Sequence, residues 1–165
     1  MLSTQRKRVT LKTGRIGVIS DTHGLIRPEA LSALKNAELI IHAGDIGKPE
    51  VLSSLKTIAP VIAIRGNNDR ESWAKKMPGI FQLSVNDVRL YVIHNVNDLE
   101  VDPAAEGFHG VISGHSHKPG IVDHDRMLFV NPGSAGPRRF KLPVTVARMD
   151  IHRSQFRVKI VELKI

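Results

Sequence analysis

Five short apolar runs in this chain each lead into residues of the types that bind metal ions, and this arrangement limits the fold more than any other feature. The runs are Ile16–Ile19, Leu39–Ile41, Val61–Ile64, Leu90–Ile93 and Val111–Ser113, and the polar residues after them are Asp21, His23, Asp45, Asn67, His94, His115 and His117. In open α/β sheets, ligands bind beyond the carboxyl ends of the strands. The sequence therefore predicts that seven polar side chains meet at one edge of a sheet.

The first half of the chain alternates strands with helices. Between the first three apolar runs, one helix is predicted over Pro28–Leu34 and a second over Val51–Leu55, because apolar residues recur there at helical spacing. The resulting β-α-β-α-β order is typical of a parallel sheet with crossover helices.

The second half has short apolar segments that follow one another closely. The expected strands are Phe81–Val85, Leu90–Ile93, Val111–Ser113, Ile121–Val122, Leu128–Val130, Val144–Met149 and Phe156–Leu163. Turn signals at Asn86-Asp87, Asp123–Arg126 and Arg153-Ser154 separate them. We therefore expect mainly antiparallel pairing in this half, together with a short helix over Asp98–Phe108.

Length and composition favour one domain. A chain of 165 residues can bury one hydrophobic core, and no repeat or low-complexity linker divides it. We expect a basic N-terminal tail over residues 1–14 and a single domain over residues 15–165. The absence of cysteine excludes a disulfide framework, an iron–sulfur site and a thiolate zinc site. No apolar run approaches the ~20 residues of a membrane helix, so we expect a cytoplasmic protein without a membrane partner.

The formal net charge of +8 has more than one explanation. A nucleic-acid partner is one, and a basic surface that suits an anionic substrate is another. The positive residues lie largely near the two ends of the chain and are not interleaved with the aromatic residues on which single-strand binders stack bases. Nucleic acid is therefore an alternative that we do not favour, and the oligomeric state, a homo-oligomer included, stays open.

The predicted ligands comprise four imidazoles, two carboxylates and one amide oxygen. This set is more than one ion needs and about right for two ions ~3.5–4 Å apart. Such ligands suit Mn, Fe, Zn, Co or Ni, among which we favour Mn²⁺. A water shared by two ions loses a proton near neutral pH, so a metal-bound hydroxide can attack and no protein nucleophile is required. The site stays cationic after the carboxylates are counted, which predicts a small phosphate ester as substrate.

The same residues form five ordered motifs that resemble those of the calcineurin-like metallophosphoesterase superfamily. The motifs are Asp21-Thr22-His23, Gly44-Asp45, Gly66-Asn67-Asn68-Asp69, His94 and Gly114-His115-Ser116-His117. With the segment Asn131–Ser134 and the short chain, they are similar to the small prokaryotic phosphodiesterase, or YfcE-like, branch. The resemblance implies an α/β fold of the metallo-dependent phosphatase type, a four-layer sandwich of two packed mixed β-sheets flanked by helices.

The resemblance also implies a role for each residue. The first ion would be held by Asp21, His23 and His117, the second by Asn67, His94 and His115, and both by Asp45. The residues implied to act in catalysis are Asp45, Asn67, Asn68 and His94. The implied activity is that of a binuclear metal-dependent phosphodiesterase. The alternative is a scaffold that kept the fold and lost turnover, like the metallophosphoesterase-like subunit of the retromer coat, but the complete ligand set argues against it.

Two positions depart from the pattern of the family. Asn68 stands where the family usually has a histidine that helps to protonate the leaving group, and an amide cannot donate a proton in that way. Asn95 follows His94 where glycine is common, which leaves the ligand in place and changes the loop.

Four further residues near the motifs have two interpretations each. Asp69 could orient a metal ligand or cap a helix. Arg65 and Arg70 could contact a phosphate oxygen of the substrate or form surface ion pairs. His42 precedes the second motif, and we favour a packing role over a ligand role for it.

Overall fold

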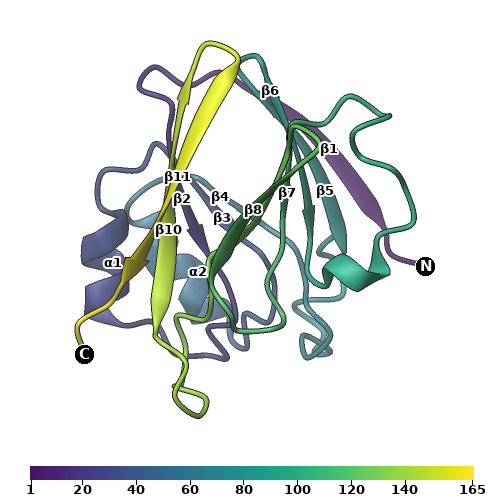
Figure 1. The fold of residues 1–165 in the computed structure, drawn as a ribbon. Coiled ribbons are helices and arrows are strands. Elements are labelled where there is room, and N and C mark those ends of the chain that lie inside the picture. The colour runs from purple at the N-terminus through teal and green to yellow at the C-terminus, as the bar shows by residue number, and fades with distance from the viewer.

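Two β-sheets packed face to face form the framework of the protein in this computed structural model, which describes residues 1–165 (Figure 1). The elements are β1 Thr4–Val9, β2 Arg15–Ile19, α1 Pro28–Leu34, β3 Leu39–His42, α2 Pro49–Lys56, β4 Val61–Ala63, β5 Ile80–Val85, β6 Val88–Ile93, the single helical turn η1 Val96–Asp98, β7 Gly110–Ile112, β8 Gly120–His124, β9 Met127–Asn131, β10 Thr145–His152 and β11 Gln155–Glu162. The expected α/β architecture of two mixed sheets is confirmed.

The five-stranded sheet has the order β11-β10-β2-β3-β4, and its strands β2, β3 and β4 run parallel, with α1 and α2 as the crossovers that the sequence predicts. Ile19, His42 and Ala63 lie side by side across these strands, so all three strands end at the same level. The loops that follow them therefore leave the sheet together.

The six-stranded sheet has the order β1-β5-β6-β7-β9-β8. Its hairpins β5–β6 and β8–β9 are antiparallel, but β6, β7 and β9 are parallel neighbours. The expectation of mainly antiparallel pairing is therefore only partly right, because turn residues mark hairpins whereas longer connections leave no local signal. Val92, Ile112 and Val130 are aligned, so these three strands also end level.

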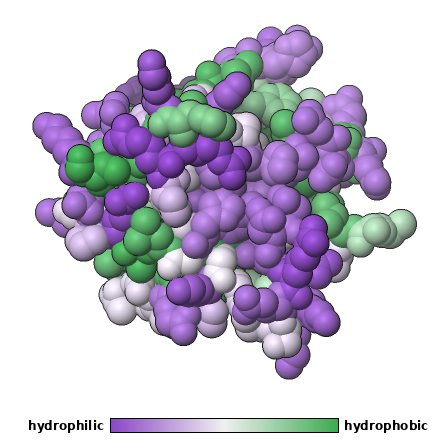
Figure 2. All heavy atoms as spheres, turned by 90° about the horizontal axis from the view of Figure 1, so that it is seen from below, coloured by the Kyte–Doolittle hydropathy of each residue, from purple (hydrophilic) through white to green (hydrophobic).

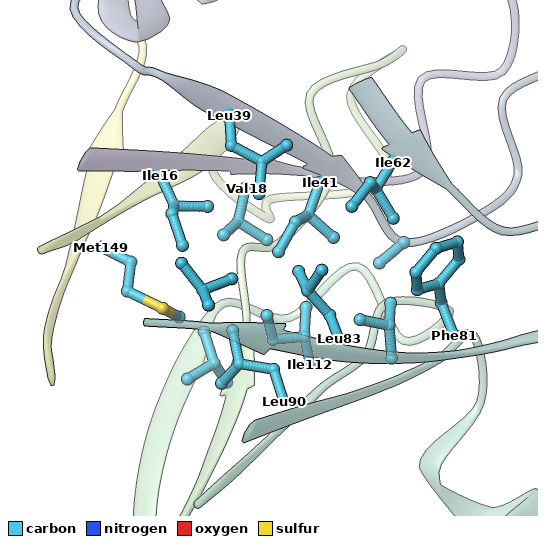
Figure 3. Packing of buried hydrophobic residues seen from close by; sticks show 14 of the residues in the cluster. Ile16, Val18, Leu39, Ile41, Ile62, Phe81, Leu83, Leu90, Ile112 and Met149 are labelled. Carbon is cyan, nitrogen blue, oxygen red and sulfur yellow. The ribbon is translucent and has the colours of Figure 1, made fainter. Parts of the chain in front are cut away.

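Eighteen buried residues fill the space between the two sheets (Figure 3). Ile16, Val18 and Ile41 approach from the five-stranded sheet, and Leu83 and Ile112 approach from the six-stranded sheet. Aromatic residues are only 4% of the chain, so branched aliphatic side chains do most of the packing. Buried apolar area stabilises the fold by about 25 cal/mol per Å², which makes this layer the main link between the sheets.

Both α-helices lie on the outer face of the five-stranded sheet (Figure 1). Leu34 of α1 and Leu55 of α2 are buried with Ile19 and Ile40 of the sheet. Successive strand residues point to opposite faces, so β2 and β3 contribute to this cluster and to the central core. Strands buried on both faces read as continuous apolar runs, which is why they stand out in the sequence.

An irregular segment covers the outer face of the six-stranded sheet instead of a helix. The helix expected over Asp98–Phe108 is wrong, because the residues after η1 form only turns. Pro103 disfavours helical backbone at the residue before it, and Gly107 has a φ of +82°. Phe108 nevertheless covers the sheet, since its ring meets that of Tyr91 edge-on with 5.2 Å between the centroids.

The expected N-terminal tail contains a strand. β1 pairs in parallel with β5 at the edge of the six-stranded sheet, from Thr4 beside Ile80 to Val9 beside Val85. Val9 packs against the central core, whereas the basic residues of β1 are exposed. A charged segment whose partner lies 76 residues away gives little local sign of this pairing. The domain boundary at residue 15 remains a prediction.

None of the helices is long and apolar enough to span a membrane.

Candidate metal centre

The loops after five strands bring the predicted ligands to a common edge. Asp21 lies at the centre, and its Oδ1 is 3.9 Å from Nε2 of His23. The same oxygen is 3.9 Å from Nε2 of His94 and 3.4 Å from Nε2 of His117. Asp21 is fully buried, so these nitrogens face a carboxylate that water does not reach.

Asp45 lies on the other side of the same imidazoles. Its Oδ2 is 3.4 Å from Nε2 of His94 and 3.9 Å from Nε2 of His23. Two groups of three residues each bring their ligand atoms within 4.8 Å of one another. One group is Asp21, His23 and His117, and the other is Asp21, Asp45 and His94. The first group matches the set expected for the first ion.

The remaining two predicted ligands form a pair at the exposed side of the centre. Nδ1 of His115 lies 3.1 Å from Oδ1 of Asn67. The ring of His115 meets that of His94 edge-on, with 5.2 Å between the centroids. All seven predicted ligands are thus neighbours, with Asn67 and His115 nearest to solvent.

Several ligand atoms have no partner within the protein. Oδ1 of Asp21 and Nε2 of His94 are both buried, and neither atom has a hydrogen-bond partner. Nδ1 of His94 lies 2.7 Å from the carbonyl oxygen of Ala43. A carbonyl oxygen can only accept a hydrogen bond, so Nδ1 carries the proton. When the ring is neutral, Nε2 therefore has a lone pair, and this lone pair points toward the carboxylates. Opposed lone pairs in a buried site fit a cation between them.

The backbone at the centre is strained in a way that points to function. Five of the seven predicted ligands have positive φ, namely Asp21 at 54°, His23 at 46°, Asp45 at 54°, His115 at 70° and His117 at 62°. Left-handed backbone is uncommon for residues other than glycine and clusters at functional sites, where surrounding structure holds it.

Glycines of the motifs allow the loops to approach one another closely. A Cβ at Gly66 would overlap the carboxylate of Asp45, and a Cβ at Gly114 would overlap the hydroxyl of Ser20 and the carboxylate of Asp21. The glycines before Asn67 and His115 are therefore needed so that each ligand loop can rest against a carboxylate.

The ionisation of the centre follows from burial and close charges. Burial raises the pKa of Asp45, but the close contact with Nε2 of His94, the charge of that ring and the amides of Asn68 outweigh burial and lower the pKa to well below its usual range. Burial lowers the pKa of His94, but Asp45 and Asp21 outweigh burial and raise it. Both effects favour a negative Asp45 facing a positive charge, which a proton or a metal ion can supply.

Asn68 has a role that its place in the motif did not reveal. Its backbone amide donates to Oδ1 of Asp45 at 2.9 Å, and its side-chain Nδ2 donates to Oδ2 at 2.9 Å. Both donors engage the same carboxylate. Asn68 therefore orients Asp45 and has no proton that it could pass to a leaving group.

Asp69 does not cap a helix, because none begins at this position, but its contacts agree with the other interpretation, that it orients a metal ligand. Its carboxylate accepts from the amides of Ile46 at 3.1 Å, Gly47 at 3.0 Å and Gly66 at 2.9 Å. The buried side chain ties the loop after β3 to the loop after β4 and thereby fixes the position of Asp45.

His42 is fully buried, so the packing interpretation is confirmed, and it also joins two ligand loops. Its Nδ1 accepts from the amide of Gly44 at 3.2 Å, so the proton lies on Nε2 and is donated to Oγ1 of Thr22 at 2.9 Å. Thr22 in turn donates to the carbonyl of Ile46. Burial, helped by the nearby His94, lowers the pKa of His42 to about 3, so the ring is neutral.

The two arginines of the third motif differ in position. Nε of Arg70 donates to the carbonyl oxygen of Asn67 at 3.0 Å, so Arg70 braces the ligand loop. Arg65 lines a pocket of about 110 Å³ that is also lined by Asn67, His94 and His115. Arg65 therefore borders a space beside the ligands.

Two serines support Asp21 and were missed among the candidate residues. Ser20 Oγ donates to Asp21 Oδ2 at 2.7 Å, and the amide of His115 donates to the same oxygen at 3.0 Å, which leaves Oδ1 free. Ser134 Oγ donates to the carbonyl oxygen of Asp21 at 2.9 Å. The segment Asn131–Ser134 was the only signal for the second of these contacts.

The edge that carries the ligands is hydrophilic at its surface. Figure 2 looks onto it from below the view of Figure 1, and hydrophilic residues occupy its middle with separate apolar patches around them. This surface suits a polar or charged substrate better than an apolar one.

Comparison with known proteins identifies a family and a fold. Residues 15–154 match the model of the calcineurin-like phosphoesterase superfamily domain. A probable metallophosphoesterase of Methanothermobacter thermautotrophicus is 38% identical over 152 residues, which are 82% of this chain and 86% of that protein.

Solved structures agree with this assignment. The structure of a novel archaeal phosphodiesterase has a TM-score of 0.73 and 25% identity, covering 89% of this chain and 99% of that one. Wild-type Vps29 from Entamoeba histolytica, complexed with Zn²⁺, shares the fold with a TM-score of 0.71 and 18% identity, covering 90% and 98% of the two chains.

Proposed function

The chain belongs to the calcineurin-like phosphoesterase superfamily, and from this premise we propose that it hydrolyses phosphodiesters with two divalent ions bound at the candidate centre. Membership makes the protein a metallophosphoesterase, a hydrolase that acts on phosphate esters. The number of ions, the identity of the metal, the ligand assignments and the preference for diesters are the proposed parts.

One observation carries the proposal. The buried Oδ1 of Asp21 and Nε2 of His94 lie 3.9 Å apart, and neither has a hydrogen-bond partner in the protein. Buried polar atoms are normally paired, and a bound cation would pair both. The carboxylates and imidazoles around them are ligands that suit a divalent transition metal.

We assign the side chains as the motifs imply. One ion would be held by Asp21, His23 and His117, the other by Asn67, His94 and His115, and both by Asp45. When bound, the ions would polarise a phosphoryl oxygen and lower the pKa of a water that attacks phosphorus. We favour Mn²⁺, with Fe, Zn, Ni and Co as alternatives that the same ligands suit.

The protein's own groups set the charge and the proton balance. Two carboxylates only partly neutralise two divalent ions, so the loaded centre attracts an anionic ester. Water adds its oxygen to phosphorus as a P–O bond breaks, and the departing alcohol takes up a proton. Asn68 cannot supply that proton, because an amide does not release a proton near neutral pH, and its contacts with Asp45 are those of a group that orients the carboxylate. Arg65, at the wall of the small pocket, is in place to contact a phosphate oxygen.

The direct test is hydrolysis of bis(p-nitrophenyl) phosphate by protein loaded with each candidate metal. We expect activity with Mn²⁺, loss of activity on chelation and recovery when Mn²⁺ is added back. Metal content measured on the untreated protein should approach two ions per chain. Full activity after dialysis against excess chelator would contradict the proposal.

A scaffold without turnover is the second candidate, because the fold is shared with Vps29. The complete ligand set favours an enzyme. If the loaded protein binds two ions and hydrolyses no diester or monoester from a broad panel, the scaffold hypothesis replaces the proposal.

A further inference from the structure

A larger cavity adjoins the small pocket at the candidate centre. The small pocket is bordered by the ligands Asn67 and His115 and also by Leu2 and Asp98. The same Leu2 and Asp98 border a cavity of about 620 Å³, so the two spaces share a wall. The chain before β1 and the turn η1, which carry these two residues, lie side by side (Figure 1). The volume of the larger cavity lies in the range of roughly 300–1,000 Å³ that is usual for small-molecule sites.

Backbone hydrogen bonds hold the shared wall in place. The carbonyl oxygen of Ser3, directly after the first wall residue, accepts from the amide of Ile80 at 2.9 Å. The amide of Asp98 donates to the carbonyl oxygen of Asn95 at 3.0 Å, and Asn95 directly follows the ligand His94. The larger cavity is therefore fixed beside the metal ligands.

This cavity is acidic, although the protein is basic. The charged side chains that border it are Asp98, Glu100, Glu106 and Arg6. The three carboxylates belong to residues 90–117, a stretch without lysine or arginine in a chain of net charge +8. Nε of Arg6 donates to Oε1 of Gln82 at 3.0 Å, which holds the guanidinium against the strands. The cavity therefore favours a cation, whereas the loaded centre beside it favours an anion.

Tyr91 of β6 brings a hydroxyl group without a partner to the cavity. The residue is 3% exposed, and the surface that remains open borders the cavity. No group of the protein forms a hydrogen bond with its hydroxyl, although buried polar groups are normally paired. Burial and the charges of Glu106 and Glu100 raise the pKa of Tyr91, so the hydroxyl keeps its proton beside these carboxylates. The hydroxyl is thus available to a bound molecule.

We propose that this cavity binds one alcohol portion of the substrate and that this portion carries a primary ammonium group. The ammonium would donate to the hydroxyl of Tyr91 and to the carboxylates of Glu100 and Glu106, while the phosphate lies at the metal centre. Its carbon chain would lie along Ile80 and Leu99, which also border the cavity.

The chemistry of the cavity favours a primary ammonium over a quaternary one. A primary ammonium has three N–H donors, enough for one hydroxyl and two carboxylates, whereas a quaternary ammonium has none. The substrate class is therefore that of phosphate esters of amino alcohols. The inference rests on the proposed function, because it names the substrate of the same centre.

The test compares product analogues that differ only in the amine. Ethyl, butyl and hexyl phosphate and the corresponding aminoalkyl phosphates are titrated into the Mn²⁺-loaded protein, and calorimetry measures their affinities. At the chain length that reaches from the centre to the cavity, we expect the terminal amine to tighten binding by about tenfold, the order expected for hydrogen bonds between charged groups.

Variants of the cavity separate the contacts of the ammonium from those of the phosphate. Tyr91→Phe removes only the hydroxyl group, and Glu100→Gln and Glu106→Gln each remove one negative charge. Each change should reduce the advantage of the amine by about threefold or more and leave the affinity for the alkyl phosphates unchanged. The matched control is Asp102→Asn, an exposed carboxylate of the same segment that does not border the cavity, and it should keep the advantage.

Two results would overturn the inference while leaving the proposed function intact. One is equal affinity for the amine and alkyl compounds at every chain length, and the other is an unchanged amine advantage when Glu100→Gln and Glu106→Gln are combined. If the loaded protein hydrolyses no ester at all, the proposed function fails. Titration of hexylamine against hexanol, neither of which carries a phosphate, then decides whether the cavity selects an ammonium group.

Discussion

The two edges of the sheets both contain residues with left-handed backbone, but the physical reasons differ. At the metal centre these residues are Asp21, His23, Asp45, His115 and His117, and at the opposite edge they are Asn86, Asp125, Arg126 and Arg153. The second set lies in the hairpin turns that the sequence predicts.

A hairpin produces this backbone locally, whereas the centre requires distant contacts. Asp125 and Arg126 form a two-residue loop between paired strands, where positive φ at both positions matches a type I′ turn. At the centre, the amide of Asp21 donates to the carbonyl of Gly44 at 3.0 Å, and that of His23 donates to the carbonyl of Asp45 at 3.0 Å. Positive φ alone is therefore weak evidence of function, and positive φ held between distant loops is strong evidence.

The largest expected difference between the edges concerns a carboxylate. Asp45→Asn should reduce kcat/KM for bis(p-nitrophenyl) phosphate by more than the roughly 10–100-fold typical of losing a group that only orients a ligand. Asp123→Asn changes an exposed carboxylate on β8 and should leave the rate unchanged. Similar rates for the two variants under saturating Mn²⁺ would show that Asp45 does not serve both ions.

Two glycines sharpen the same comparison through stability. Gly114→Ala places a methyl group against Ser20 and Asp21 and should lower the free energy of unfolding by roughly 1–3 kcal/mol. Gly120→Ala adds a methyl group with no atom within 4 Å and should change stability by less than about 0.5 kcal/mol. Urea unfolding of the metal-free proteins measures both values. Equal destabilisation would mean that the close approach at Gly114 is not required.

The exposed hairpin turn should tolerate glycine where a strand does not. Arg126→Gly removes the steric cost of positive φ and should stabilise the protein by at most about 1 kcal/mol. Arg157→Gly, at an exposed position in β11, should instead destabilise it by roughly 0.5–1 kcal/mol. Thermal unfolding gives both signs, and a loss of stability in Arg126→Gly would contradict the turn geometry.

The smallest effect is a pH dependence at the edge away from the metal centre. The hydroxyl of Thr13 lowers the pKa of Glu38, burial opposes this slightly, and the amides of Lys12, Thr13 and Gly14 lower it further. A carboxyl whose pKa is lowered by folding stabilises the protein above its unfolded pKa and loses that contribution as the pH falls through the folded pKa.

Glu38→Gln should therefore lower the melting temperature slightly at neutral pH. The difference from the wild-type protein should shrink as the pH is lowered from about 7 to about 3, where the wild-type carboxyl becomes protonated. A difference that stays constant over this range would mean that the charge of Glu38 does not contribute.

The sequence by itself determined the parts of the protein that have a local signature. Strands buried on both faces appear as apolar runs, so β2, β3 and β6 could be predicted. The ligands follow those runs directly, and hence their arrival at one edge could also be predicted. Asn86 and Asp125 marked hairpins because turn residues act through their own backbone.

Only the tertiary structure decided features that depend on distant partners. β1 became a strand because β5 offered it an edge, although its own residues are charged. Asp69 reaches amides 22 and 23 residues away in sequence, and Ser134 reaches the carbonyl oxygen of Asp21 across 113 residues. Contacts of this kind arise when separate elements pack together, and no periodic pattern in the chain records which of them will meet.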